Sequence, residues 1–444
     1  DPLDARVVAW WQHKVKQIYA RIPDFGGFLV KANSEGQPGP QDFGRSQAEG
    51  ANLLARALEP HGGIVVWRAF VYDAAVPEDR HKQAFDELVP LDGQFRPNAC
   101  LQTKNGAIDF QPREPFHPLF GAMPKTPMFL EFQITQEYLG CATHLVYLGP
   151  LFKETLDADT HVAGPGSTVL KVITGALAKH TLTGMAGVSN IGDERNWCGH
   201  PFAAANWYAF GRLAWDPELS AESIADEWLR RTFTNDARFV AAAQRIMLDS
   251  REAAVEYMTP LGLHHLMAES HHYGPGPWVT GLERDDWTAT YYHRADAAGL
   301  GFDRTKTGSN AIAQYAPAVQ RKHERLDTCP ENLLLWFHHV PWAHRMQSGR
   351  SLWDELCYVY SRGVERARSM HTRWLTLEGG IDAGRFEHVR QLLEIQVREA
   401  RWWRDACLLY FQTFSGRPIP EALEPPQGTL EEYRTHRDYY VPGI

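Results

Sequence analysis

The sequence predicts an α/β fold built from parallel βα units in its first half, followed by a mostly helical region. Short runs of apolar and β-branched residues recur through residues 1–216, and helical stretches separate them. Long amphipathic runs with few strand signals begin near Pro217. Strands that alternate with helices at this spacing indicate either a barrel or an open doubly wound sheet.

The predicted strands are rich in Val, Ile, Leu and Phe, and each ends in a loop with Gly, Asn or other polar residues. They lie at residues 25–33, 63–71, 99–104, 128–134 and 184–189. Helical patterns lie between or before them, at residues 3–19, 48–58, 81–88 and 169–178. No GxGxxG or P-loop motif follows any of these strands, which weakens a nucleotide-binding interpretation.

The second half is predicted to be helical. Its amphipathic runs lie at residues 221–233, 237–257, 352–375 and 383–411, and a Gly- and Pro-rich loop lies at 271–278. Tryptophans on these patterns are expected to pack in the core or at an interface: Trp336, Trp342, Trp353, Trp402 and Trp403. We therefore divide the chain into a partial barrel, residues 1–216, and a helical C-terminal domain, residues 217–444.

Composition excludes several classes of protein. The net charge of the 444 residues is -9, and no stripe of Lys and Arg suggests nucleic-acid binding. No apolar run approaches the length of a bilayer span. The six cysteines form no CxxC pair, which indicates buried thiols and a reducing, cytoplasmic compartment, with export left open. The first residues lack an initiating Met and an apolar leader, so we expect this terminus to be an internal cut.

Polar residues follow the predicted strands at the positions where parallel barrels carry their active sites. In chain order they are Lys31, Asn33, Glu35, Arg68, Lys104, Asp109, Glu137, Asn190, Asp193 and Glu194. Glycosidic cleavage needs one carboxylic acid and one carboxylate, and Glu35, Asp109 and Glu137 supply three candidates. An isolated acidic residue is more often a loop residue or a helix cap. Here three cations accompany the acids, which favours a pocket for an anionic substrate.

Longer motifs resemble the α-glucuronidases of glycoside hydrolase family 67. The stretch FGGFLVKANSEGQPGP at residues 25–40 is similar to the family segment that carries the general acid. Further matches are VWR at 66–68, TKNGAIDF at 103–110, EFQITQEY at 131–138, LGLHH at 261–265 and GFDRT at 301–305. The likeness covers essentially the whole chain and includes the loop at 271–278.

The resemblance implies an inverting exo-enzyme, without cofactor or metal. It would release (4-O-methyl-)glucuronic acid from the α-1,2 link to the terminal xylose of xylo-oligosaccharides. By motif, Glu35 would be the general acid, and Asp109 with Glu137 would position and deprotonate the attacking water. The residues implied to bind substrate are Lys31, Arg68, Lys104 and Trp287.

The resemblance also implies a (β/α)8 TIM barrel, of which this chain would hold about the last five βα units, followed by the helical region. We expect such a stretch to be inactive alone, because an open half-barrel exposes strand edges. A homodimer through the C-terminal helices, as in relatives, is a further expectation. The alternative from another class is a non-catalytic sugar-binding or assembly fragment.

Two other patterns have less specific interpretations. The pairs His264-His265, His271-His272 and His338-His339 lack an HExxH motif, so packing or hydrogen bonding is favoured over metal binding. Glu131 and Gln133 share strand parity and are expected to face the barrel interior as structural or supporting polar groups.

Overall fold

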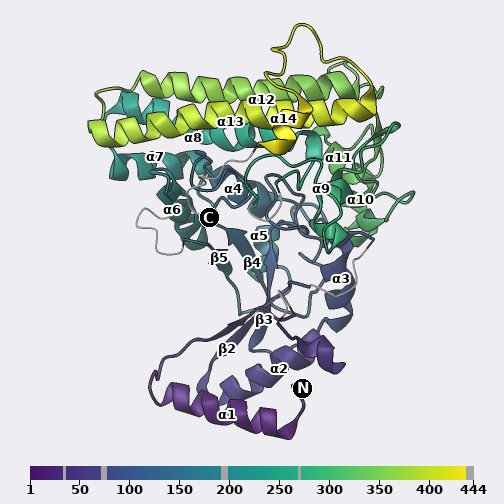
Figure 1. Ribbon diagram of the computed structural model, residues 1–444. Helices are drawn as coiled ribbons and strands as arrows, with labels where there is room; N and C mark the ends of the chain where they lie inside the picture. The colour runs from purple at the N-terminus through teal and green to yellow at the C-terminus, as the bar shows by residue number, and fades with distance from the viewer. Residues whose placement is uncertain (34–36, 72–77, 192–198, 269–271, 437–444) are drawn as a thin grey trace.

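The computed structural model describes residues 1–33, 37–71, 78–191, 199–268 and 272–436 (Figure 1). Its main sheet has five parallel strands: β1 (Gly27–Val30), β2 (Ile64–Arg68), β3 (Ala99–Lys104), β4 (Met128–Gln133) and β5 (Met185–Val188). Their order in space is their order in the chain. A doubly wound sheet instead reverses its strand order at a switch point. The parallel βα prediction is confirmed and strand order favours the barrel, while the closed eight-stranded barrel stays a prediction.

Burial along the strands explains why these segments form the sheet. All six residues of β3 are buried, as expected for a central parallel strand covered on both faces. Strand β2 alternates, with Val65 and Trp67 buried and their neighbours partly exposed. Strands β1 and β5 are the two edges of this sheet, and Leu29 in β1 is 57% exposed.

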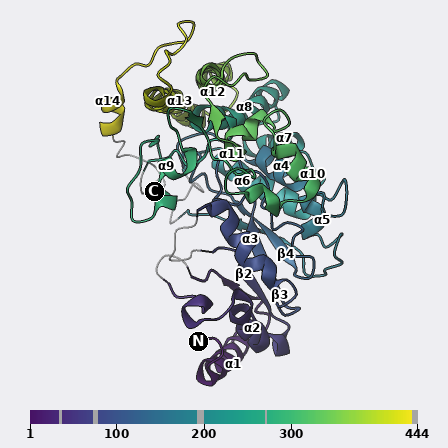
Figure 2. The ribbon, with the colours of Figure 1, turned by 90° about the vertical axis from the view of Figure 1, so that its right-hand side faces the viewer.

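Helices cover the sheet and precede its strands. In the first half they are α1 (Ala5–Tyr19), α2 (Gln47–Leu58), α3 (Gln83–Leu88), α4 (Gly149–Asp157), α5 (Val169–Ile173) and α6 (Ala203–Trp215). Helix α2 packs against β2 and β3, and α1 packs against α2 (Figure 2). A capping box fixes the start of α2, because the Ser46 hydroxyl accepts the Glu49 N–H while the Glu49 carboxylate accepts the Ser46 N–H.

The second half is mostly helical, as predicted. Its helices are α7 (Ala221–Thr232), α8 (Ala237–Met258), α9 (Ala289–His293), α10 (Pro317–His323), α11 (Leu334–Phe337), α12 (Leu352–Leu375), α13 (Ala383–Ser415) and α14 (Leu430–Thr435). Helix α12 packs against both α8 and α13, and the two long helices α12 and α13 lie side by side (Figures 1 and 2). A short antiparallel pair joins β6 (Gly299–Leu300) to β7 (Val340–Pro341).

The predicted tryptophan core is confirmed for most positions. Trp336 and Trp353 are fully buried, and Trp342 and Trp403 are 3% and 2% exposed. Trp402 is partly buried. The five described cysteines are all buried and unpaired. Among the described residues, no helix combines the length and apolar character needed to cross a bilayer.

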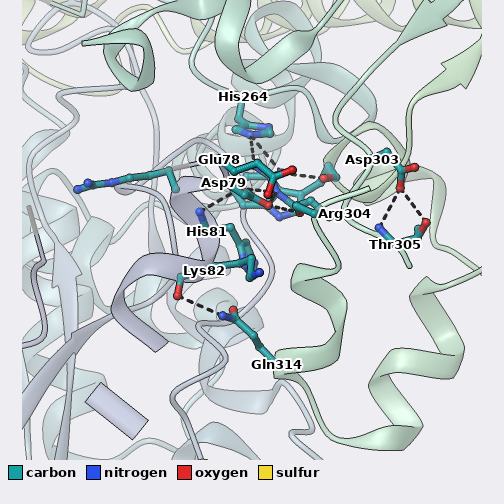
Figure 3. Close-up of polar contacts among 12 residues, drawn as sticks. Glu78, Asp79, His81, Lys82, His264, Asp303, Arg304, Thr305 and Gln314 are labelled. Atoms are coloured by element: carbon teal, nitrogen blue, oxygen red, sulfur yellow. Dashed lines mark hydrogen bonds and ion pairs between the residues drawn. The ribbon is translucent and has the colours of Figure 1, made fainter. Parts of the chain in front are cut away.

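A buried polar network joins the segment before α3 to the helical region (Figure 3). Asp79 and Arg304 form an ion pair at 3.0 Å, and both side chains have 0% exposure. The Arg304 guanidinium also donates to the carbonyl oxygen of Trp336 at 2.7 Å and lies 3.4 Å from Nε2 of His264. The Ser309 hydroxyl donates to the Asp79 carboxylate at 2.6 Å. The two contacts of Asp79 connect residues more than 200 positions apart and hold the backbone beside the next residue, Arg80.

Candidate active site

A cavity of about 1440 Å³ lies where the carboxyl ends of the parallel strands meet loops of the helical region. The strand-end residues that line it include Lys31, Asn33, Arg68, Lys104, Asp109 and Glu137. From the helical region come His265, His272, Arg284, Asp286 and Trp287, among others. Every predicted site residue that the structure describes therefore lines one cavity. The predicted acid Glu35, with Asp193 and Glu194, lies outside the described residues.

Strand register explains this convergence. Val30 pairs with Trp67, Arg68 pairs with Gln102, and Lys104 pairs with Glu131. From β1 to β4 each strand thus ends one or two residues beyond the end of its neighbour, and side chains at or after these ends face the same space. The fold produces the grouping without any local sequence signal beyond the strands themselves.

Asp109 is held as a carboxylate. The Lys104 ammonium donates to its Oδ1, and the Tyr138 hydroxyl donates to its Oδ2 at 2.9 Å. Burial alone would raise the pKa of Asp109, but the charge and hydrogen bond of Lys104 and the bond from Tyr138 outweigh burial and lower the pKa. Asp109 is therefore ionised at neutral pH.

Glu137 is oriented by groups from three directions. Gln133 in β4 donates to its Oε2 at 2.7 Å, and the Asn190 amide donates to the same oxygen at 3.4 Å. Nδ1 of His272 lies 3.2 Å from Oε1. Tyr138 connects the two acids, because its hydroxyl binds Asp109 while its ring stacks on His272 at 4.8 Å between ring centroids. The two carboxylates thus belong to one connected arrangement.

Several cations also line the cavity. Arg68 binds Glu131 through two hydrogen bonds, at 2.8 and 2.5 Å, and Glu131 is fully buried. Glu131 is therefore a buried polar group that holds Arg68, in keeping with the expectation of a structural or supporting role. Arg80 lies 3.5 Å from Asp286, and Arg284 binds the same carboxylate with two bonds of 2.9 Å. Paired in this way, the guanidinium groups keep fixed positions at the cavity wall.

Trp287 contributes an aromatic wall. It closes the one-turn helix Asp285–Trp287, and its side chain is 40% exposed within the cavity lining. Its carbonyl oxygen lies 3.2 Å from Nε2 of His265, and the Arg284 guanidinium lies 5.8 Å from its ring centroid. A large exposed ring at a polar cavity is suited to stacking on the apolar face of a sugar.

The family is decided by sequence comparison. The family model described as the glycosyl hydrolase family 67 middle domain matches residues 1–197, and that of the family 67 C-terminus matches residues 198–424. The chain belongs to glycosyl hydrolase family 67. The resemblance found from the motifs is thus confirmed.

Named relatives support the same family. The alpha-glucuronidase A of Emericella nidulans is 43% identical over 428 residues, which cover 94% of this chain and 50% of the relative. A probable alpha-glucuronidase A of Aspergillus clavatus is 43% identical over 424 residues, with the same coverages. That of Aspergillus niger is 40% identical over 451 residues, covering 98% of this chain and 53% of the relative. The chain spans about half the length of the curated relatives it matches.

The histidine pairs of this family 67 chain behave as hydrogen-bonding and packing groups. His264 is buried against Arg304, and His265 is packed on Tyr292, with ring centroids 4.8 Å apart. Burial, with a smaller contribution from the neighbouring His272, lowers the pKa of His265 to about 4. The described residues contain no group of three or more His, Cys, Asp or Glu side chains placed to hold a metal. His271 lies outside the described residues.

The cavity residues that sequence reasoning missed include Arg80, Tyr138, His272 and Arg284. Tyr138 and Arg284 lie within three residues of predicted site residues, so a wider window around each motif would have included them. Arg80 has no such signal, and His272 lies in the loop at 271–278 that the likeness includes. The network around Asp79 holds the backbone beside Arg80, and His272 contacts Glu137.

Glu114 fixes the turn that carries Asp109. Its Oε2 accepts the N–H of Ile108 at 2.9 Å, and its Oε1 accepts the N–H of Gln111 at 2.7 Å. A Cβ on Gly106 would lie 2.1 Å from Oε2, so this close approach requires glycine. Burial raises the pKa of Glu114 to about 7, although the two N–H groups oppose the rise.

This shift predicts a pH-dependent stability. Below the ordinary pKa of 4.5 both states are protonated, whereas between 4.5 and about 7 only the folded state keeps the proton. The stability contributed by Glu114 is therefore lost as pH rises through this window. We expect the free energy of unfolding, relative to Glu114→Gln, to fall by on the order of 2 kcal/mol from pH 5 to pH 8. Denaturant titrations of both proteins at each pH measure this difference in the free energy of unfolding. Parallel pH curves for the two proteins would refute the assignment, and Glu378→Gln, at an exposed site, is the control.

Proposed function

We propose that this chain carries catalytic and substrate-binding residues of an inverting exo-α-glucuronidase. The substrate would be (4-O-methyl-)glucuronic acid linked α-1,2 to the terminal xylose of a xylo-oligosaccharide. The observation that supports this most is the sharing of one cavity by two oriented carboxylates and several strand-end cations. The names of the relatives, one an alpha-glucuronidase A and two a probable alpha-glucuronidase A, support the same activity.

The proposed reaction uses acid and base on opposite sides of the glycosidic bond. Water attacks the anomeric carbon and gives a proton to the Asp109–Glu137 pair, while Glu35 protonates the departing xylose oxygen. Inversion requires the acid and base about 6.5–9.5 Å apart, so that a water fits. The ionised state of Asp109 suits a proton acceptor. Glu137, oriented by Gln133, Asn190 and His272, would share the contact with the water.

Substrate recognition would rest on charge and stacking. Lys31, Arg68 and Lys104 would bind the uronic acid, its carboxylate included, because charge-assisted hydrogen bonds are shorter and stronger than neutral ones. Trp287, which lines the same cavity, would stack on sugar. The aglycone would then extend towards the loops of the helical region.

Charge recognition predicts the effect of Arg68→Ala. We expect the preference for a uronate substrate over its neutral glucosyl analogue to fall at least about tenfold, measured as the ratio of kcat/KM values in the complete gene product. Removal of Arg68 leaves Glu131 buried without its cation, so Lys31→Met provides a second test without that disturbance. The control is Arg96→Ala, whose Arg–Glu59 pair is exposed and outside the cavity. An unchanged ratio in both cavity variants would remove the charge-recognition model.

A further inference from the structure

Four cations surround one aromatic ring in the cavity. Nζ of Lys104 lies 4.2 Å from the Phe70 ring centroid and Nζ of Lys31 lies 4.8 Å from it. The guanidinium carbons of Arg68 and Arg80 lie 5.6 and 5.9 Å from the same centroid. All five side chains line the cavity. No sequence motif assigned a role to Phe70.

The sheet places Phe70 at the centre of these cations. Strand β2 lies between β1 and β3, so the residues that follow it lie between Lys31, after β1, and Lys104, at the end of β3. The Ala69 N–H donates to the carbonyl of Gln102 at 2.8 Å and extends the strand pairing by one residue. In extended backbone, Phe70 then faces the same side as Arg68.

An aromatic ring has a distinct effect on such a group. Its faces carry negative potential and attract cations within about 6 Å. Unlike a carboxylate, it has no formal charge and leaves the cations able to bind an incoming anion. Without it, the mutual repulsion of like charges in a partly buried site would favour side chains that point apart.

We propose that Phe70 is a positioning residue that determines specificity for the uronate: its ring gathers the Lys31 and Lys104 ammonium groups so that they converge on the substrate carboxylate. This inference rests on the function proposed above. It names the group by which the site selects an acid sugar over a neutral one. Arg68, Arg80 and Lys104 are each also paired with a carboxylate, and the two arginines complete the ring of charge.

The test replaces Phe70 in the complete gene product with 4-fluoro-, 3,4,5-trifluoro- and pentafluorophenylalanine. Each step weakens the negative potential of the ring face and preserves its shape. Calorimetry measures the Kd of D-glucuronate and of its methyl ester, which keeps the sugar ring and lacks the charge. We expect the Kd of glucuronate to rise stepwise, by about tenfold across the series, with the Kd of the ester within twofold.

Other results overturn the inference in distinguishable ways. If both Kd values rise together, Phe70 stacks on the sugar and does not gather cations. If the Kd of glucuronate stays constant across the series and the parent protein binds glucuronate normally, this inference is rejected and the proposed function stays intact. A parent protein that binds no glucuronate rejects both. Phe116, which packs on Tyr315 outside the cavity lining, receives the same replacements as a control and should leave both Kd values unchanged.

Discussion

Replacement of Asp109 by Asn should lower kcat on an aldouronic acid substrate by about 10²- to 10⁴-fold, the usual contribution of a positioned acid or base. The amide keeps the size of the side chain and can still contact Tyr138 and Lys104, but it cannot accept a proton from water. Substrate binding should change much less, so the loss falls on kcat and kcat/KM together. Steady-state kinetics of the complete gene product measure this. A kcat within threefold of the parent would exclude Asp109 as the base.

Two companion variants refine this result. Glu137→Gln should also lower kcat strongly if the two acids share the role, whereas a small effect would leave Asp109 as the sole base. Tyr138→Phe removes one of the groups that lower the pKa of Asp109. The acidic limb of its pH profile should therefore move to higher pH, because the base becomes protonated more easily. Asp157→Asn, whose side chain is 59% exposed at the C-terminal end of α4, is the control.

Replacement of Arg304 by Met should destabilise the protein by about 3–5 kcal/mol, because it leaves Asp79 as a buried charge without its cation. The matched control is Arg325→Met. Its pair with Asp327 is 70% and 62% exposed, and its loss should cost about 1 kcal/mol or less. Denaturant unfolding compares the two. Equal, small losses of stability in the two variants would contradict the role given to the buried polar network shown in Figure 3.

The same buried polar network also bears on activity, because it lies next to Arg80 of the cavity. The N–H of Arg80 donates to the Tyr291 hydroxyl at 2.9 Å, and its guanidinium lies beside Asp286 in the cavity wall. A double variant, Asp79→Asn with Arg304→Met, removes both buried charges and should recover part of the lost stability. Full activity in a stable double variant would show that the ion pair serves only the fold.

Local sequence determined much of the fold. The five strands follow from short apolar runs such as Ile64–Arg68, and the long helices begin at side-chain caps such as Ser351 and Asp382. Helices α4 and α6 were not predicted. Both begin without a side-chain cap, after Leu148 and Phe202, so the sequence lacks a start signal there. The predicted helix at 169–178 ends already at Ile173, where Thr174 leaves helical geometry.

The candidate site was predictable in part for a different reason. Strand ends of a parallel sheet converge, so Lys31, Arg68 and Lys104 could be grouped from the strand pattern alone. The positions of Arg80 and His272 depend on contacts between segments far apart in the chain, which no local pattern encodes. The central place of Phe70 likewise depends on strand order, which the sequence left open between barrel and doubly wound sheet.

The most direct test of the central claim is to follow, by proton NMR, the complete gene product acting on an aldouronic acid with a terminal α-1,2-linked glucuronic acid. Acid and base that face each other across a water would release β-glucuronic acid first, and the α-anomer would appear later by mutarotation. Early appearance of the α-anomer would contradict the inverting arrangement. Absence of any released uronic acid would contradict the enzymatic account itself.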